Sequence, residues 1–263
     1  MKLTTIAAAV ALSAWTVSAN AVVIEDDGHD GAGTGLQSVI DGLTVAPNDG
    51  VSSVDVNTDQ LSDGKDSYWN VTASGASVST FVMEIAGLAG SNTFGVYDRR
   101  NPNNYVELFS GSDTYDDDFN SQKTLGLLND GSVGINGIDS GVDFSGKTFG
   151  YYLGSSKGMA EGEWGTPVYF SDSLLNPGES DQMVALQGND TDYLEIDGFF
   201  DGKWTDNEFI LAWEDILYKD SDKDFNDLVV MVESVVPVPE PGTLALLGLG
   251  LVGLGAARRR HKA

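Results

Sequence analysis

The clearest indication of the fold is residues 209–233, FILAWEDILYKDSDKDFNDLVVMVE. Two apolar runs stand on either side of an acidic connection, which predicts two neighbouring strands over 209–216 and 228–236. The second run, Leu-Val-Val-Met-Val at 228–232, is apolar at consecutive positions. A strand with this pattern is buried on both faces, so we expect 228–232 to lie in the interior of a sheet.

The rest of the body, residues 22–236, shows the same kind of pattern. Short apolar and aromatic runs alternate with clusters of Gly, Asp, Asn and Ser, and no segment keeps a helical apolar period over three turns. Eight Asp-Gly dipeptides favour tight turns. Further strands are expected over 79–86, 93–97, 105–109, 147–153, 166–170 and 182–186. We therefore predict one all-β domain over 22–236, an antiparallel β-sandwich or jelly-roll-like fold.

A short internal similarity lies within these strands. Residues 92–97, Asn-Thr-Phe-Gly-Val-Tyr, resemble residues 147–152, Lys-Thr-Phe-Gly-Tyr-Tyr. Asp-Phe-Asn occurs at both 118–120 and 224–226. Two related β halves are one interpretation, but the match is too short to establish a repeat.

The charge of the body excludes several classes of partner. Residues 22–236 hold 39 of the 40 acidic residues and nine of the 14 basic residues, a formal net charge of −30. Such a body cannot neutralise a phosphate backbone, which argues against direct binding of nucleic acid. The chain has no cysteine, so disulfides, thiolate metal sites and cysteine nucleophiles are excluded. Cations are the expected binding partners of a body with this negative charge.

Both ends of the chain differ from the body. Lys2 precedes an apolar stretch of small residues, and Ala-Asn-Ala at 19–21 has the A-x-A cleavage pattern. Residues 1–21 are therefore predicted to be a secretory signal peptide, removed by the Sec export pathway after Ala21. At the other end, residues 237–263 combine three prolines, an uncharged span over 242–257 and an arginine cluster. Sixteen helical residues reach about 24 Å, against about 30 Å for a bilayer core, so this short hydrophobic helix is marginal as a membrane span.

The C-terminal segment resembles the PEP-CTERM sorting signal of Gram-negative bacteria. The resemblance rests on a Pro-Glu-Pro, the Gly/Leu-rich span and basic residues at the extreme end, in that order. It implies export, transient inner-membrane anchoring, cleavage by an exosortase, and release to the surface or exopolysaccharide matrix. The residues that carry this signal are Pro239, Glu240, Pro241, Arg258, Arg259 and Arg260.

The acidic connection within 209–233 is the strongest candidate for chemistry. Asp220, Asp222, Asp224 and Asp227 can curl their carboxylates around one point if the backbone turns. Ca²⁺ takes six to eight oxygen ligands, so this spacing predicts a calcium site, whereas the alternative is an exposed Asp-rich turn. It is not an EF-hand, because position six is Phe225 rather than Gly and position twelve is Met231 rather than Glu.

Residues 147–233 resemble the DUF4114 family of extracellular β domains. The resemblance is most specific in Trp-Glu-Asp at 213–215, Asp-Lys-Asp-Phe-Asn-Asp at 222–227 and the valine-rich run after them. It implies a link to calcium-rich surface and matrix proteins. A version of the segment 181–186 that contains a histidine is known in this family. This chain has Gln182 there, so any role of that histidine is absent. The positions carried over are Glu214, Asp215, Asp220, Asp222, Asp224 and Asp227.

Two other functions and one further metal site remain open at this point. Trp69, Trp164 and Trp204 would stack on sugars in a lectin-like, carbohydrate-binding module if they are exposed rather than in the core. Glu195-Ile196-Asp197 begins like a glucanase strand, but Phe199 and Phe200 stand where the second Glu belongs, which argues against a glycan hydrolase. Glu161 and Glu163 form another carboxylate pair, and the run 116–118 is a candidate for a second cation site.

The sequence therefore predicts an exported, non-enzymatic protein of the cell surface or the exopolysaccharide matrix of a biofilm. It is expected to be stabilised by calcium and processed by an exosortase. Extracellular polysaccharide is its expected partner.

Overall fold

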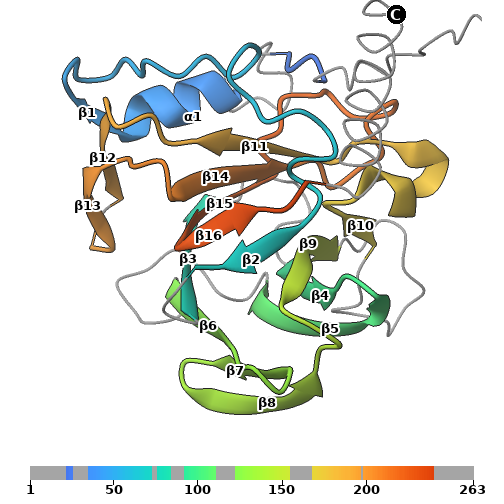
Figure 1. The fold of residues 1–263 in the computed structure, drawn as a ribbon. Helices are drawn as coiled ribbons and strands as arrows, with labels where there is room; N and C mark the ends of the chain where they lie inside the picture. The colour runs from blue at the N-terminus through green and yellow to red at the C-terminus, as the bar shows by residue number, and fades with distance from the viewer. Residues whose placement is uncertain are drawn as a thin grey trace, which may run out of the picture.

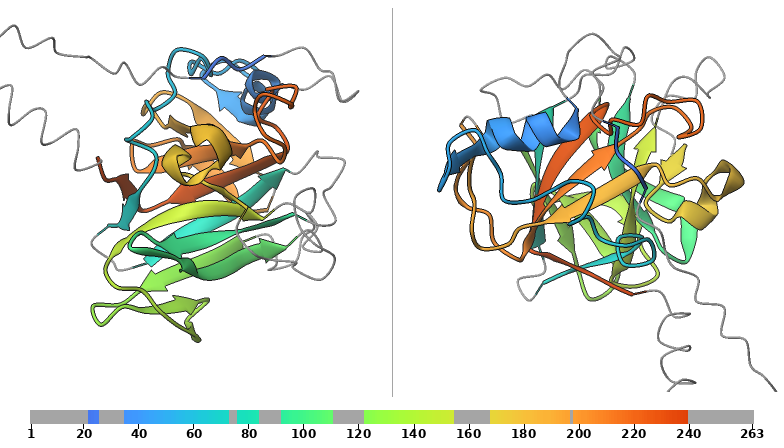
Figure 2. Two further views of the ribbon diagram at one scale, coloured as in Figure 1. Left: turned by 90° about the vertical axis from the view of Figure 1, so that its right-hand side faces the viewer. Right: turned by 90° about the horizontal axis from the view of Figure 1, so that it is seen from above.

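The computed structural model describes residues 22–25, 35–72, 76–83, 92–110, 122–154, 168–196 and 198–239, with 76–83 as backbone only. Within these ranges a seven-stranded sheet lies between a six-stranded sheet and a layer made of one helix and a three-stranded sheet (Figure 1). The side view in Figure 2 shows the layers one above another. All pairs of strands are antiparallel, so the predicted all-β sandwich is confirmed.

The central sheet contains both strands of residues 209–233. In spatial order its strands are β11 (Met183–Gln187), β14 (Glu208–Trp213), β15 (Leu228–Glu233), β3 (Ala76–Met83), β6 (Gln122–Leu127), β7 (Ser132–Ile135) and β8 (Ile138–Asp143). Because β15 pairs with both β14 and β3, the prediction of an interior strand over 228–232 is confirmed.

The outer sheet covers one face of the central sheet. Its path is β16 (Val235–Pro237), β2 (Trp69–Val71), β9 (Thr148–Gly154), β4 (Thr93–Asp98) and β5 (Asn101–Ser110), and β10 (Tyr169–Phe170) also pairs with β9. The two segments of the internal similarity are the neighbours β4 and β9.

The opposite face is covered by α1 (Leu36–Leu43) and by the small sheet β1 (Thr44–Ala46), β12 (Tyr193–Ile196) and β13 (Phe200–Lys203). Two short 3₁₀ helices, η4 (Ser173–Leu175) and η5 (Pro177–Glu179), connect β10 to β11. Figure 2, seen from above, shows α1 crossing the central strands. The helix buries Leu36, Val39 and Ile40, whose i, i+3, i+4 spacing forms one apolar face.

Two hydrophobic cores separate the three layers. Along β14, Phe209, Leu211 and Trp213 pack into the core beneath the outer sheet, whereas Ile210 and Ala212 pack beneath α1. Successive side chains on a strand point to opposite faces, which explains the division. The central strands are therefore apolar on both sides, as the run 228–232 indicated.

Several predicted strands have different bounds in the structure. The single strand expected over 228–236 is wrong: β15 belongs to the central sheet and β16 to the outer sheet. Ser234, with a φ of 59°, turns the chain between them, and Val235 then enters the core. The strand expected over 209–216 ends at Trp213 because the acidic connection begins there. In the described part of 166–170, the strand is Tyr169–Phe170.

The apolar pattern of the sequence did not predict α1 or seven of the strands, including the β6–β7–β8 meander. These strands are short or rich in Gly, Ser and Asp, and β8 is almost wholly exposed, so they lack a clear apolar pattern. A local signal was present at the β7–β8 turn, where Asn136 and Gly137 have φ values of 52° and 77°. Asn-Gly favours this mirror-image turn as Asp-Gly does.

The predicted signal peptide, 1–21, the hydrophobic span, 242–257, and the arginines at 258–260 lie outside the described residues. Among the residues that are described, no helix has the length and apolarity to cross a bilayer.

Candidate metal centre

The acidic connection between β14 and β15 begins with two carboxylates that point to opposite sides of the central sheet. The Glu214 carboxylate accepts a hydrogen bond from the backbone N–H of Phe225, whose side chain belongs to the core beneath α1. The Asp215 carboxylate accepts one from Asn92 Nδ2, next to β4 of the outer sheet. Strand alternation thus divides the acidic residues into two groups.

The first group consists of Glu214, Asp222 and Asp224. One oxygen of each carboxylate lies within 4.8 Å of the other two. Glu214 and Asp224 are fully buried, and Asp222 is half-buried. Oxygens that bind one Ca²⁺ at 2.3–2.6 Å are at most about 5 Å apart, so these three can share one cation.

Glu214 shows why this group needs a counter-charge. Its Oε2 is buried and has no hydrogen-bond partner among the described residues. The pKa of Glu214 is raised to about 7. Burial is the largest cause, the N–H of Phe225 and the Ser221 hydroxyl act in the lowering direction, and the Asp224 and Asp222 carboxylates raise the pKa further. An uncompensated charge at this depth is costly, which favours either a proton or a metal ion.

The backbone of the connection is held in a curled conformation. Lys223 and Phe225 have positive φ values, 65° and 51°, although neither is glycine. Phe225 is fully buried, and the Asp224 carbonyl accepts a hydrogen bond from the Leu36 N–H at the start of α1. This curl places the side chains of residues 222 and 224 on the same side.

The second group is the pair Asp215 and Asp227. The Asp227 carboxylate accepts a hydrogen bond from the Asp215 N–H at 2.8 Å. Burial, followed by repulsion from Asp215, raises the pKa of Asp227 to about 8. The charges of Glu214 and Asp222 also raise the pKa of Asp227, so the pair interacts with the three-carboxylate group.

Asp220 lies apart from both groups. Its side chain is 60% exposed and has Lys219 Nζ 3.6 Å away. The structure thus brings together three of the six predicted ligands, pairs two others and leaves Asp220 in solvent.

Gln182 has a role that the residue type alone did not indicate. It binds the backbone at the start of the acidic connection. Its buried amide donates to the carbonyls of Glu214 and Ile216 and accepts from the Tyr218 N–H. The side chain therefore holds the backbone of 214–218 and is a structural part of the site.

The residues considered for sugar binding or hydrolysis do not form a site within the described ranges. Trp69 and Trp204 are fully buried and cannot stack on a sugar. Glu195 is exposed on β12. Trp164, Glu161, Glu163, Asp197 and the run 116–118 lie outside the described residues.

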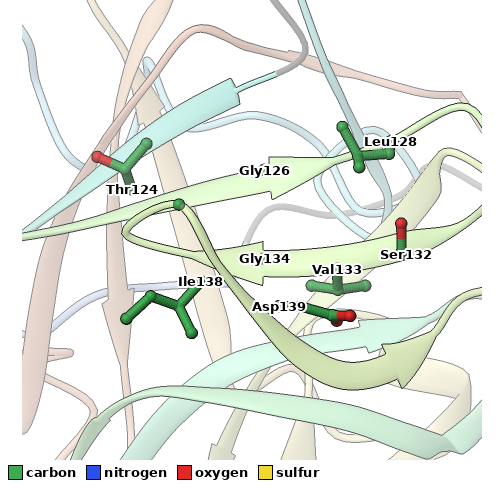
Figure 3. A pocket seen from close by; sticks show the side chains of 9 residues that line it. Thr124, Gly126, Leu128, Ser132, Val133, Gly134, Ile138 and Asp139 are labelled. Carbon is green, nitrogen blue, oxygen red and sulfur yellow. The ribbon is translucent and has the colours of Figure 1, made fainter.

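A pocket of about 390 Å³ lies on the β6–β7–β8 meander (Figure 3). Gly126 and Gly134 pair across its floor, and the exposed Leu128 and Ile138 stand near its ends. Among the described residues that line it, Asp139 is the single charged one and none is aromatic. These residues provide neither the carboxylate pair of a glycosidase nor a surface for sugar stacking.

Comparison with known families agrees with both predicted segments. Residues 144–235 match the family model described as a domain of unknown function, DUF4114. Residues 237–260 match the PEP-CTERM protein-sorting motif and include all six predicted sorting-signal residues. No curated protein and no solved structure matches the chain. The sorting motif supports an exported protein that is processed by an exosortase.

Proposed function

We propose that this exported chain, with its DUF4114 region and its PEP-CTERM motif, is a non-enzymatic surface or matrix protein stabilised by calcium. Glu214, Asp222 and Asp224 form the core of its cation site. Exopolysaccharide is the partner that its destination suggests. The family matches include no catalytic family.

The observation that carries the calcium proposal is the buried Oε2 of Glu214. A buried acceptor without a donor is unusual in a folded protein, and this one lies beside two further carboxylates. The carboxylates repel one another unless a positive charge lies between them. A divalent cation supplies that charge and ligates the free oxygen.

The donor set favours calcium over softer metals. The three ligating groups are carboxylates, and within the described residues the cluster includes no histidine. Carboxylate oxygens suit hard cations, and Ca²⁺ completes its shell with carbonyls and water in a flexible geometry. Extracellular modules bind Ca²⁺ with dissociation constants of about 10⁻⁴–10⁻³ M, which is sufficient for a structural role outside the cell.

Calcium in this position ties together distant parts of the fold. Glu214 follows β14, and residues 222–224 precede β15 and contact the start of α1. A bound ion thus fixes the curled connection between β14 and β15 and links the central sheet to the layer that contains α1. In a protein without disulfides, this role replaces a covalent cross-link.

The sorting tail follows the domain without a linker. The N–H of Val238 donates to the Tyr68 carbonyl, so the chain is held by the outer sheet up to the residue before the Pro-Glu-Pro. We infer that the tail anchors the folded domain transiently in the inner membrane until the exosortase cleaves it.

Calorimetric titration of the exported protein with CaCl₂ tests the calcium proposal. We expect saturable binding that Asp224→Asn weakens at least about tenfold, a loss of about 1.4 kcal/mol. Asp220→Asn is the matched control, because Asp220 is exposed outside the cluster. The affinity of this variant for calcium should equal that of the unaltered protein. Absence of binding, or equal weakening by both substitutions, contradicts the proposal.

A further inference from the structure

We propose that the N-terminal segment Val22–Glu25 is a positioning element of the cation site and that calcium binding is coupled to its docking. This inference rests on the proposed function. The segment is the first part of the chain after the predicted signal peptide, and it lies against residues 198 positions away. None of its residues belongs to the carboxylate group.

The segment binds Lys223, the residue between the proposed ligands Asp222 and Asp224. The Glu25 N–H donates to the Lys223 carbonyl at 2.8 Å, and the Lys223 ammonium lies 2.8 Å from Glu25 Oε1. Tyr218, whose ring lies under the same ammonium, donates its hydroxyl hydrogen to the Val23 carbonyl. Residue 223 is thus held from its backbone and from its side chain.

This contact bears directly on the geometry of the ligands. The left-handed conformation of Lys223 turns the chain so that residues 222 and 224 present their carboxylates to one point. A lysine in this conformation has a steric cost, which its surroundings must offset. The N-terminal segment supplies two of the contacts that hold it.

The segment is anchored by residues outside the carboxylate group. Ile24 is 3% exposed and belongs to the core beneath α1. The Asn57 side chain accepts from the Ile24 N–H at 2.8 Å and donates to its carbonyl at 3.1 Å. Gln60 donates to the Val22 carbonyl. Asn57 therefore controls docking of the segment without contacting Glu214, Asp222 or Asp224 in any hydrogen bond of the structure.

Coupling of this kind is reciprocal. If docking of the segment favours calcium binding, calcium must favour docking by the same factor. The amide hydrogens of Ile24 and Glu25 report on docking, because both are hydrogen-bonded only across the interface.

The test compares calcium affinity and N-terminal hydrogen exchange in the exported protein and in Asn57→Ala. We expect the substitution, which removes two hydrogen bonds, to weaken calcium binding about five- to tenfold. Calcium should slow exchange in the peptide that contains residues 22–25 of the unaltered protein. Tyr218→Phe, which loses one hydrogen bond, should weaken binding by a smaller factor in the same direction.

Asn189→Ala is the matched control. The Asn189 side chain also makes two hydrogen bonds, one donated to the Ser53 hydroxyl and one accepted from the Thr191 N–H, and it is exposed like Asn57. Its affinity for calcium should be unchanged. If the unaltered protein binds calcium and Asn57→Ala binds it equally tightly, only the coupling is refuted. If the unaltered protein binds no calcium, the proposed function fails as well.

Discussion

Tyr97 on β4 lies directly against Gly150 on β9. The two residues pair across the strands, and a Cβ atom on Gly150 would overlap the tyrosine ring. The symmetry-related contact is Tyr152 on β9 against Gly95 on β4, where an added Cβ would be 2.6 Å from the ring. Each glycine thus makes room for the tyrosine of the other strand.

This arrangement explains the internal similarity in the sequence. The two Thr-Phe-Gly segments pair antiparallel about a local two-fold axis, so the glycine of each copy meets the tyrosine of the other. Tyr68 joins the two tyrosines in a cluster on the outer face of the sheet. The similarity is therefore a packing motif between neighbouring strands.

We expect Gly150→Ala to destabilise the protein by about 2 kcal/mol, because the buried ring of Tyr97 has no room to move. Urea unfolding measures the loss. Gly146→Ala, two residues before β9, is the control, since nothing lies within 4 Å of its added Cβ. Equal stability of the two variants would show that the tight contact is not part of the native packing.

Without metal, the protein should lose stability as the pH rises. The pKa of Glu214 is raised from 4.5 to about 7 and that of Asp227 from 3.8 to about 8, so the folded state holds protons that the unfolded state has released. The free energy of unfolding therefore falls between about pH 4 and pH 8. Thermal unfolding in a chelator should give a higher Tm at pH 5 than at pH 8, and the reverse order would contradict these pKa shifts.

Glu214→Gln should have opposite effects with and without calcium. The amide keeps an acceptor for the Phe225 N–H, and its NH₂ group can donate to the carboxylates of Asp222 and Asp224. At pH 8 in a chelator we expect a higher Tm than for the unaltered protein. With calcium present, the order of the two Tm values should be reversed, because the variant lacks a charged ligand. A lower Tm in both conditions would indicate that Glu214 has a purely structural role.

The mature protein should retain β16. Val235 is 1% exposed in the core beneath the outer sheet. Cleavage before it would remove a packed edge strand from beside Trp69 and Val71. Intact mass of the protein from culture medium should fit a chain that begins at Val22 and ends no earlier than Val238. A mass that ends before Val235 would mean that the domain is stable without this strand.

Several features were predictable because they depend on neighbours along the chain. The apolar run 228–232 indicated an interior strand, and the structure buries it on both faces. The Pro-Glu-Pro and basic tail indicated a sorting motif, which the comparison confirms. The strands of 122–143 were missed, since their Gly-rich sequence has no strong pattern and their pairing with β3 is a tertiary contact.

The β class, the C-terminal sorting motif and the supply of acidic side chains follow from the sequence alone, because each is a property of local pattern or composition. Which of the carboxylates meet depends on contacts that form only in the folded chain. Strand alternation separates Glu214 from its neighbour Asp215, and the curl at Lys223 joins Glu214 to residues 222 and 224. The N-terminal segment lies against that curl across 198 residues of sequence, a contact set by long-range packing.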